Sequence, residues 1–207
     1  MEKTDVIVVD DLVTPTYSTV LHNDAKQYLQ YCYIEKTTKP DHADKGYDIG
    51  IADENTYDVG QFVCPIFDIE QPPRALKFDS YGLFLKPLIY TIRDTFPDYK
   101  LDTPMRIKAN LLLKQESFPP FHYNVIHVDS LDESKWSLVY YLDDSDGDTV
   151  LFNEFKSDRP EKLTIFKKIS PKKNRVVLFN SARYHASSNP RVNSERRVIN
   201  IVMDTYK

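Results

Sequence analysis

Seven short stretches rich in β-branched and aromatic residues follow one another in the second half of the chain, after position 104. They are RIKANLLL, YNVIHV, WSLVYYL, TVLFNEF, LTIFKKI, RVVLFN and RRVINIVM, and turns containing polar residues, Gly, Pro or Asn separate them. Such spacing is typical of an all-β sandwich or barrel, because each strand turns back after a few residues. This half of the chain is therefore predicted to form an antiparallel β core.

The first half of the chain has helical periodicity instead. After a short predicted strand at 5–9, Thr14 followed by proline predicts a helix N-terminus, since threonine caps a helix and proline fits its first turn. Apolar residues then recur at three- and four-residue steps as far as Cys32. A second periodic set spans 78–96, and a proline inside it predicts that the helix kinks or begins there. Residues 36–60 are polar without periodicity and predict a loop.

Helices first and strands afterwards predict a mainly β chain of the α+β class. Helices that cover one face of a jelly-roll core would bury the apolar faces of both. At 207 residues the chain is long enough for one well-buried domain and too short for two. We therefore expect one domain over 1–207, with a helical support region at 1–103 and a jelly-roll core at 104–207.

Charge and cysteine content limit the partners and the location of the protein. The net charge of -4 offers no electrostatic reason to expect a nucleic-acid partner. No stretch reaches the apolar length of a membrane span, and the opening apolar run is too short for a signal peptide. Cys32 and Cys64 cannot form a disulfide framework, and we predict that both are small core residues. A cytoplasmic location follows by default, and the sequence carries no signal for the oligomeric state.

The dipeptide pattern His-x-Asp occurs three times. On a strand, residues i and i+2 share a face, so one strand can direct both side chains at a single metal ion. The spacing alone has little weight, because 22 aspartates make such pairs common. The first pair lies on the predicted first helix away from its apolar stripe, the second lies in a polar loop, and only the third lies on an apolar strand. The pairs are His22/Asp24, His42/Asp44 and His127/Asp129.

A third metal ligand is expected from a distant strand. His122 is too close to the third pair to close a site comfortably, whereas His185 follows a strand 58 residues after His127. Two histidines and one carboxylate form the facial triad that leaves coordination positions open for a cosubstrate and O2. The alternative is that His185 is a hydrogen-bonded loop histidine.

Four motifs in order resemble the Fe(II)/2-oxoglutarate dioxygenase superfamily, and specifically its prolyl 4-hydroxylase-like branch. They are NVIHVD, WSLVYYLDD followed by DGDTVLF, ISPKKNRVVLFNSARYH, and ERRVINIVM, and together they cover about 104–203. Two departures stand out. Asp146-Gly147 replaces the usual Gly-Gly turn, and the loop ESFPPFHY is longer than the common glycine-containing form. The first half of the chain resembles the family only in layout.

The resemblance implies a double-stranded β-helix core that uses Fe(II), 2-oxoglutarate and O2, with ascorbate left open as a reductant. It places the far carboxylate of 2-oxoglutarate on a basic residue of the last strand. Arg196 and Arg197 lie on opposite faces of that strand, and alignment with the family pattern selects Arg196, whose guanidinium suits a carboxylate. Tyr141 matches a family position whose hydroxyl binds the same carboxylate, although it is also an ordinary barrel aromatic.

The resemblance also implies hydroxylation of a peptidyl side chain, proline first, with release of succinate and CO2. Trp136 and Arg183 are candidate substrate contacts, and each is equally explained by packing. Free amino acids and other small molecules stay open as substrates. The alternative function is a cupin-like metal-binding barrel, either a regulator or an isomerase.

Overall fold

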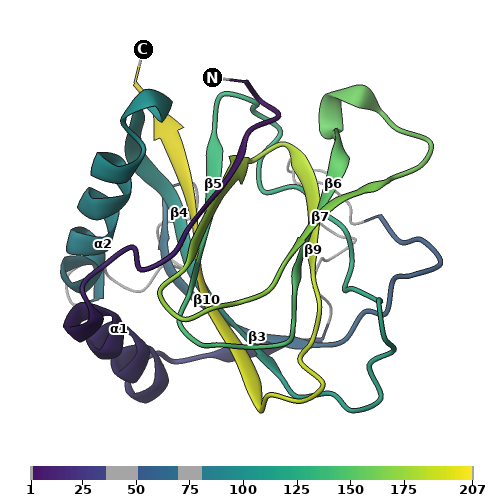
Figure 1. Cartoon of the computed structure of the whole chain (residues 1–207), viewed down its shortest axis with the longest axis horizontal. Helices are drawn as coiled ribbons and strands as arrows, with labels where there is room; N and C mark the ends of the chain where they lie inside the picture. The colour runs from purple at the N-terminus through teal and green to yellow at the C-terminus, as the bar shows by residue number, and fades with distance from the viewer. Residues whose placement is uncertain (1, 36–50, 70–80, 207) are drawn as a thin grey trace.

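Two antiparallel sheets form the body of the protein (Figure 1), for which a computed structural model describes residues 2–35, 51–69 and 81–206. The larger sheet has the strand order β1-β8-β5-β10-β4-β3-β2, and the smaller has the order β7-β6-β9. The larger sheet comprises β1 (Val6–Val9), β2 (Cys32–Ile34), β3 (Gln61–Asp68), β4 (Leu101–Leu113), β5 (Trp136–Tyr141), β8 (Val176–Asn180) and β10 (Glu195–Thr205). The smaller sheet comprises β6 (Thr149–Phe155), β7 (Ile165–Ile169) and β9 (Arg183–Ser187).

An apolar cluster joins the facing sides of the two sheets, as in a jelly roll. Its members come from β5, β8 and β10 of the larger sheet and from β6 and β7 of the smaller one. They are Val139, Tyr141, Leu151, Ile169, Val177, Phe179 and Val198. We call the space between the sheets the barrel interior.

Both helices lie on the other side of the larger sheet (Figure 1). These are α1 (Pro15–Gln27) and α2 (Tyr81–Thr95), and short 3-10 turns follow at Pro97–Tyr99 and Lys156–Asp158. The predicted cap is present, because the Thr14 side chain accepts a hydrogen bond from the backbone N–H of Tyr17. The fold class predicted from the sequence is therefore confirmed. In the described part of the chain, no helix has both the length and the hydrophobicity needed to cross a bilayer.

Strand alternation explains how one sheet supports two apolar layers. Along β10, Ile199 and Ile201 pack with the helices, whereas Val198 packs in the barrel interior. The layer under the helices includes Leu21 and Leu88. Every second residue of the central strands therefore faces the barrel interior.

Several local predictions were wrong in the first half of the chain. Cys32 begins β2 and is exposed instead of closing the face of the first helix, whereas Cys64 is buried as expected. Strand β3 was not predicted, because its sequence QFVCPIFD contains a proline and does not alternate. The second helix does not begin at Pro87, because α2 already includes Tyr81 and continues past Pro87; position 78, where the periodic set begins, lies outside the described residues.

Two further predictions failed around the histidines. His22 was expected to be exposed, but it is half-buried, and its Nδ1 lies 2.6 Å from Oδ1 of Asp143. The segment YNVIHV was expected to be a regular strand, and it makes only isolated bridges, at Tyr123, Ile126 and His127. The pair His42/Asp44 lies outside the described residues.

Candidate metal centre

His127 and His185 face each other across an antiparallel bridge. The backbone N–H of each residue donates to the carbonyl oxygen of the other, with both N···O distances 2.9 Å. Directly opposed residues project their side chains to the same side. The two imidazole centroids accordingly lie 4.4 Å apart. The segment of His127 is extended at this point, although it belongs to neither sheet, so the residue two positions on can turn its side chain to the same place.

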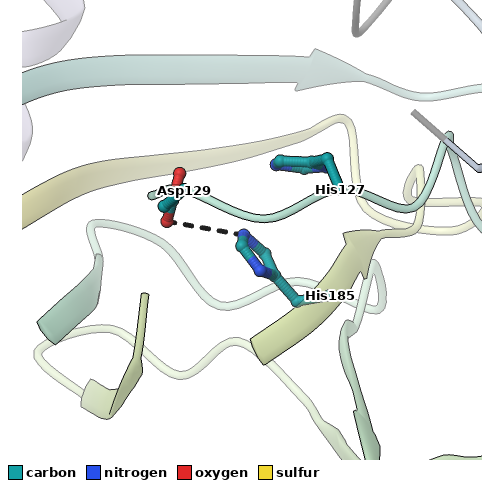
Figure 2. Close-up of side chains that lie close together, drawn as sticks. All are labelled: His127, Asp129 and His185. Carbon is teal, nitrogen blue, oxygen red and sulfur yellow. Dashed lines mark ion pairs between the residues drawn. The ribbon is translucent and has the colours of Figure 1, made fainter. Parts of the chain in front are cut away.

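That residue is Asp129, which completes a cluster of three metal-binding side chains (Figure 2). Nε2 of His185 lies 3.4 Å from Oδ2 of Asp129, and one ligand atom from each residue lies within 4.8 Å of the others. The backbone N–H of Asp129 donates to the carbonyl of Ser181, just before β9. The structure therefore brings together the three residues that the sequence nominated.

Both histidines have a fixed tautomer. Nδ1 of His127 lies 3.1 Å from the carbonyl oxygen of Val125, and Nδ1 of His185 lies 3.0 Å from that of Arg183. A carbonyl oxygen can only accept, so each Nδ1 carries the proton and each Nε2 keeps a lone pair for a metal. Such outer contacts orient metal-binding histidines in proteins.

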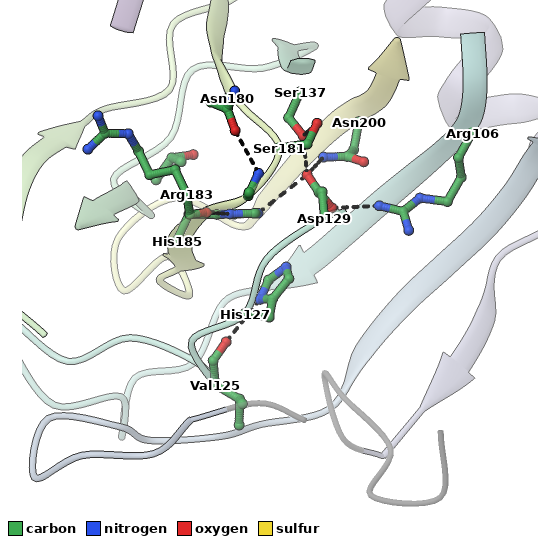
Figure 3. Close-up of polar contacts among 12 residues, drawn as sticks. Arg106, Val125, His127, Asp129, Ser137, Asn180, Ser181, Arg183, His185 and Asn200 are labelled. Atoms are coloured by element: carbon green, nitrogen blue, oxygen red, sulfur yellow. Dashed lines mark hydrogen bonds and ion pairs between the residues drawn. The ribbon is translucent and has the colours of Figure 1, made fainter. Parts of the chain in front are cut away.

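Donors from three adjacent strands hold the Asp129 carboxylate (Figure 3). Arg106 of β4 donates to Oδ1 at 2.6 Å, and Ser137 of β5 donates to Oδ2 at 2.8 Å. Asn200 of β10 donates to Oδ2 at 3.2 Å. The Oγ atoms of Ser137 and Ser181 are 2.9 Å apart, which links this network to the turn between β8 and β9. Both oxygens of the carboxylate are thus held by donors of the protein.

The electrostatics favour the protonation states that a metal requires. Burial, followed by the charge of His185, lowers the pKa of His127 to about 3. Burial also lowers the pKa of His185. Burial raises the pKa of Asp129, but the opposing charges of His185 and Arg106 outweigh it and hold that pKa below its usual range. Two neutral imidazoles and one ionised carboxylate are the donor set of non-haem Fe(II) facial triads. These residues therefore fit Fe(II).

A second polar cluster surrounds Arg196, near the N-terminal end of β10. The guanidinium is buried, and its Nε donates to the carbonyl of Gly147 at 2.8 Å. Its NH2 donates to Oγ1 of Thr149 at 2.7 Å, and the hydroxyl of Tyr141 donates to the same oxygen at 2.7 Å. Thr149 therefore links the two predicted cosubstrate contacts. Its own hydroxyl proton remains available for a carboxylate.

The turn before β6 is shaped by Arg196. A Cβ on Gly147 would lie 2.5 Å from the carbonyl oxygen of Ser188 and 3.1 Å from Cδ of Arg196, so only glycine fits here. The preceding Asp146, where the family usually has glycine, accepts hydrogen bonds from three backbone N–H groups at 191–193. This departure from the family pattern is therefore stabilised locally.

Arg197 points to the other face of β10. Its NH2 donates to Glu195 at 3.0 Å, and its guanidinium lies 6.0 Å from the ring centroid of Tyr31. Its NH1 lies 3.8 Å from Asp143. The two arginines thus occupy different environments, as strand alternation requires.

The two candidate substrate contacts lie away from the three metal-binding side chains. Trp136 packs in the layer under the helices, with its ring 4.7 Å from that of Tyr99. Arg183 donates to the carbonyls of Phe152 and Thr4 and lies over the ring of Phe155. Figure 3 shows its side chain directed away from Asp129. These contacts favour packing roles for both residues.

Comparison with known proteins agrees with the geometry of the site. The profile described as the 2OG-Fe(II) oxygenase superfamily matches residues 114–203, which confirms the resemblance seen in the motifs. Among curated proteins, none matches the chain.

Solved structures share the fold at low sequence identity. An oxidoreductase of the 2OG-Fe(II) oxygenase family from Burkholderia pseudomallei is 16% identical with a TM-score of 0.59, covering 98% of this chain and 86% of that one. The non-heme alpha ketoglutarate dependent epimerase SnoN from nogalamycin biosynthesis is 8% identical with a TM-score of 0.59, covering 98% and 78%. A prolyl hydroxylase in complex with a hypoxia inducible factor peptide from Trichoplax adhaerens is 13% identical with a TM-score of 0.50, covering 97% and 84%.

Proposed function

We propose that this chain, whose residues 114–203 match the 2OG-Fe(II) oxygenase superfamily, is an oxygenase that hydroxylates a peptidyl side chain, proline first. Proteins of this superfamily use Fe(II), 2-oxoglutarate and O2. The observation that carries the proposal is the meeting of His127, Asp129 and His185 within 4.8 Å. Their two nitrogens and one oxygen occupy one side of a metal and leave other positions open.

The residues of the chain have distinct roles in this reaction. Nε2 of His127 and of His185 and the carboxylate of Asp129 would hold the metal. Arg196, with Tyr141 and Thr149, would bind the 5-carboxylate of 2-oxoglutarate. When bound, Fe(II) and 2-oxoglutarate supply the oxidising chemistry that consumes O2 and releases succinate and CO2.

The larger sheet contributes orientation and exclusion of water. Arg106, Ser137 and Asn200 fix the carboxylate that the metal needs. On β10, Val198 of the apolar cluster in the barrel interior stands between Arg196 and Asn200 on the same face of the strand. A dry interior strengthens every ionic contact and limits side reactions.

The substrate is proposed from resemblance. Four motifs resemble the prolyl 4-hydroxylase-like branch, and a prolyl hydroxylase in complex with a peptide shares the fold. An epimerase shares it as well, so the fold by itself is compatible with more than one substrate class. Proline-containing peptides are therefore the first substrates to test, by mass spectrometry for the gain of one oxygen atom. Modification of small metabolites with no modification of any peptide would contradict this part of the proposal.

The test of the oxygenase function compares Asp129→Ala with Asp132→Ala, an exposed aspartate just outside the site. Under anaerobic conditions, wild-type protein and Asp132→Ala should bind Fe(II) and then develop the visible charge-transfer band of its 2-oxoglutarate chelate. On exposure to O2, both should release CO2 from 2-oxoglutarate. Asp129→Ala should do neither, because the site loses its only anionic ligand among the described residues. Metal binding without the band or CO2 release in the wild type would favour the cupin-like alternative.

A further inference from the structure

Lys108 lies in the barrel interior close to the metal centre. It stands on β4 two residues after Arg106 and two before Asn110, so the three side chains share a face. Across the sheet, Lys108 pairs with Asn200 of β10. Both Arg106 and Asn200 donate to the carboxylate of Asp129. Lys108 is therefore flanked by two residues that touch a metal ligand.

The ammonium group of Lys108 has no bonded partner in the described part of the chain. No hydrogen bond or ion pair joins it to another described residue, although its charge acts on His127, Asp129 and His185. Burial, reinforced by the charge of Arg106, lowers its pKa to about 8, which leaves it mostly charged at neutral pH. The Lys108 side chain is half-buried, and a half-buried cation without a partner would be stabilised by a bound anion.

Unsatisfied polar atoms lie on the same face. Oδ1 of Asn110 and Oδ1 of Asn200 are buried without a hydrogen-bond partner among the described residues, and so is Nε of Arg106. Buried polar groups are normally paired in proteins, so such a group of atoms points to a bound molecule. That molecule would carry an anionic group that binds the ammonium group of Lys108.

The balance of charge supports an additional anion. With Fe(II) bound, the metal, Arg106, Lys108 and Arg196 carry more positive charge than Asp129 and doubly ionised 2-oxoglutarate neutralise. In a buried site, unbalanced charge is unfavourable. A further carboxylate, such as one on the substrate, would reduce the excess.

We propose that Lys108 binds a carboxylate group in the barrel interior, at a position separate from that of Arg196. Arg196 pairs with Leu112, four residues beyond Lys108 on β4. At about 3.3 Å per residue, the two cationic positions are roughly 13 Å apart along the sheet. The inference rests on the proposed function. The carboxylate belongs either to the metal-binding end of 2-oxoglutarate or to the substrate, and the experiment separates these sources.

The experiment uses the variant Lys108→Met, which keeps an apolar stem of similar length. Lys114→Met is the matched control, because Lys114 lies just beyond β4, half-exposed, and pairs with Glu116. In the first arm, anaerobic Fe(II)-loaded protein is titrated with 2-oxoglutarate, and the chelate band reports affinity. In the second arm, with 2-oxoglutarate saturating, the same band is followed while L-proline or L-prolinamide is added. N-acetyl-prolyl-aspartate amide and its asparagine counterpart are compared in the same way.

Either of two results supports the proposal. If the carboxylate belongs to the cosubstrate, Lys108→Met weakens 2-oxoglutarate binding about tenfold or more, as expected for loss of a charged hydrogen bond. If it belongs to the substrate, 2-oxoglutarate binding is unchanged. A carboxylate probe then binds better than its amide, and Lys108→Met abolishes that preference. Lys114→Met should match the wild type in both arms.

Three results count against the proposal. Unchanged binding of 2-oxoglutarate and of every carboxylate probe in Lys108→Met overturns it, and so does the lack of any preference for a carboxylate over its amide when 2-oxoglutarate binding is unchanged. Fe(II) titration shows whether the variant is intact, because removal of a like charge should leave metal affinity equal or higher. Weaker Fe(II) binding would assign Lys108 to folding instead. If the wild type forms no chelate, the proposed function itself fails.

Discussion

Individual side chains around Asp129 show how the metal centre is prepared by residues that do not touch the metal. Ser137 and Asn200 both donate to Oδ2, and Arg106 donates to Oδ1. A carboxylate without these donors could rotate away from the histidines.

The variant Ser137→Ala should bind metal more weakly with the fold intact. Loss of a hydrogen bond to a metal ligand typically lowers metal affinity by about 10- to 100-fold. Anaerobic titration with Fe(II) or Mn(II) measures the change. Ser134→Ala is the control, because Ser134 also donates to a carboxylate, that of Asp132, on the exposed surface. Equal metal affinity in the two variants would show that Ser137 does not position Asp129.

The stability of the metal-free protein should fall below pH 6.5 because of His127. Its pKa is lowered to about 3 in the folded protein, whereas an unfolded histidine has a pKa of about 6.5. The unfolded state therefore binds a proton that the folded state does not, and this stability is lost as the pH falls from about 6.5 towards 3. Between pH 6.5 and 5, this proton should cost about 1.5 kcal/mol of unfolding free energy.

Urea unfolding at the two pH values, with a chelator present, tests this expectation. His127→Gln should show a smaller loss than the wild type, and the loss that remains includes that of His185, whose pKa is also lowered by burial. His122→Gln, which changes a histidine outside the metal centre, should keep the full loss. The same pH dependence in both variants would mean that His127 is protonated in the folded protein.

Among the elements, β10 is the strand whose two faces contribute to different parts of the molecule. Its alternate residues serve the helix-packed layer and the barrel interior, and its two adjacent arginines follow the same alternation. The extended segment of His127 differs from β10, because it is not a strand of a sheet. It belongs to neither sheet, yet bridges at Ile126 and His127 hold it in an extended conformation.

The matched pair Arg196→Met and Arg197→Met should separate cosubstrate binding from stability. Arg196→Met should weaken 2-oxoglutarate binding about tenfold or more, because a guanidinium hydrogen bond to a carboxylate is charge-assisted. Arg197→Met should leave that affinity unchanged and lower the unfolding free energy, since the partly buried carboxylates of Asp143 and Glu195 lose a charged partner. The chelate band measures the first quantity and urea unfolding the second. The reverse pattern would place the cosubstrate on the helix side of β10.

For the whole molecule, the N-terminal segment and the smaller sheet are tied together by one buried arginine. Arg183 of β9 donates to the carbonyl of Phe152 on β6 and to the carbonyl of Thr4 just before β1. Strand β1 in turn pairs with β8 of the larger sheet. Arg183 therefore connects the two sheets through a segment from the start of the chain.

The variant Arg183→Met should lose about 2–3 kcal/mol of unfolding free energy, because it leaves two carbonyls without their charged donor. Urea unfolding measures the loss, and metal titration should show unchanged affinity. A variant of unchanged stability that fails to turn over substrate would instead support the substrate role suggested by the sequence.

Local patterns in the sequence were sufficient for most of the elements and for the nomination of the metal ligands. The alternation in RRVINIVM placed Arg196 and Arg197 on opposite faces, because side-chain direction along a strand depends only on neighbouring residues. The cap at Thr14 was predictable for the same reason. The third ligand, His185, was nominated by exclusion and by resemblance, with no local signal of its contact.

Only the tertiary structure decided how distant segments complete one another. Strand β3 lacks a clear pattern and exists because β4 and β2 pair with its two edges. Only the structure shows that Arg196 and Tyr141 both donate to the hydroxyl oxygen of Thr149. The lack of a bonded partner for the Lys108 ammonium group among the described residues could likewise not be predicted from the sequence. The groups that surround a side chain come from strands far away in the sequence. Contacts of this kind depend on packing between elements, which no short stretch of sequence encodes alone.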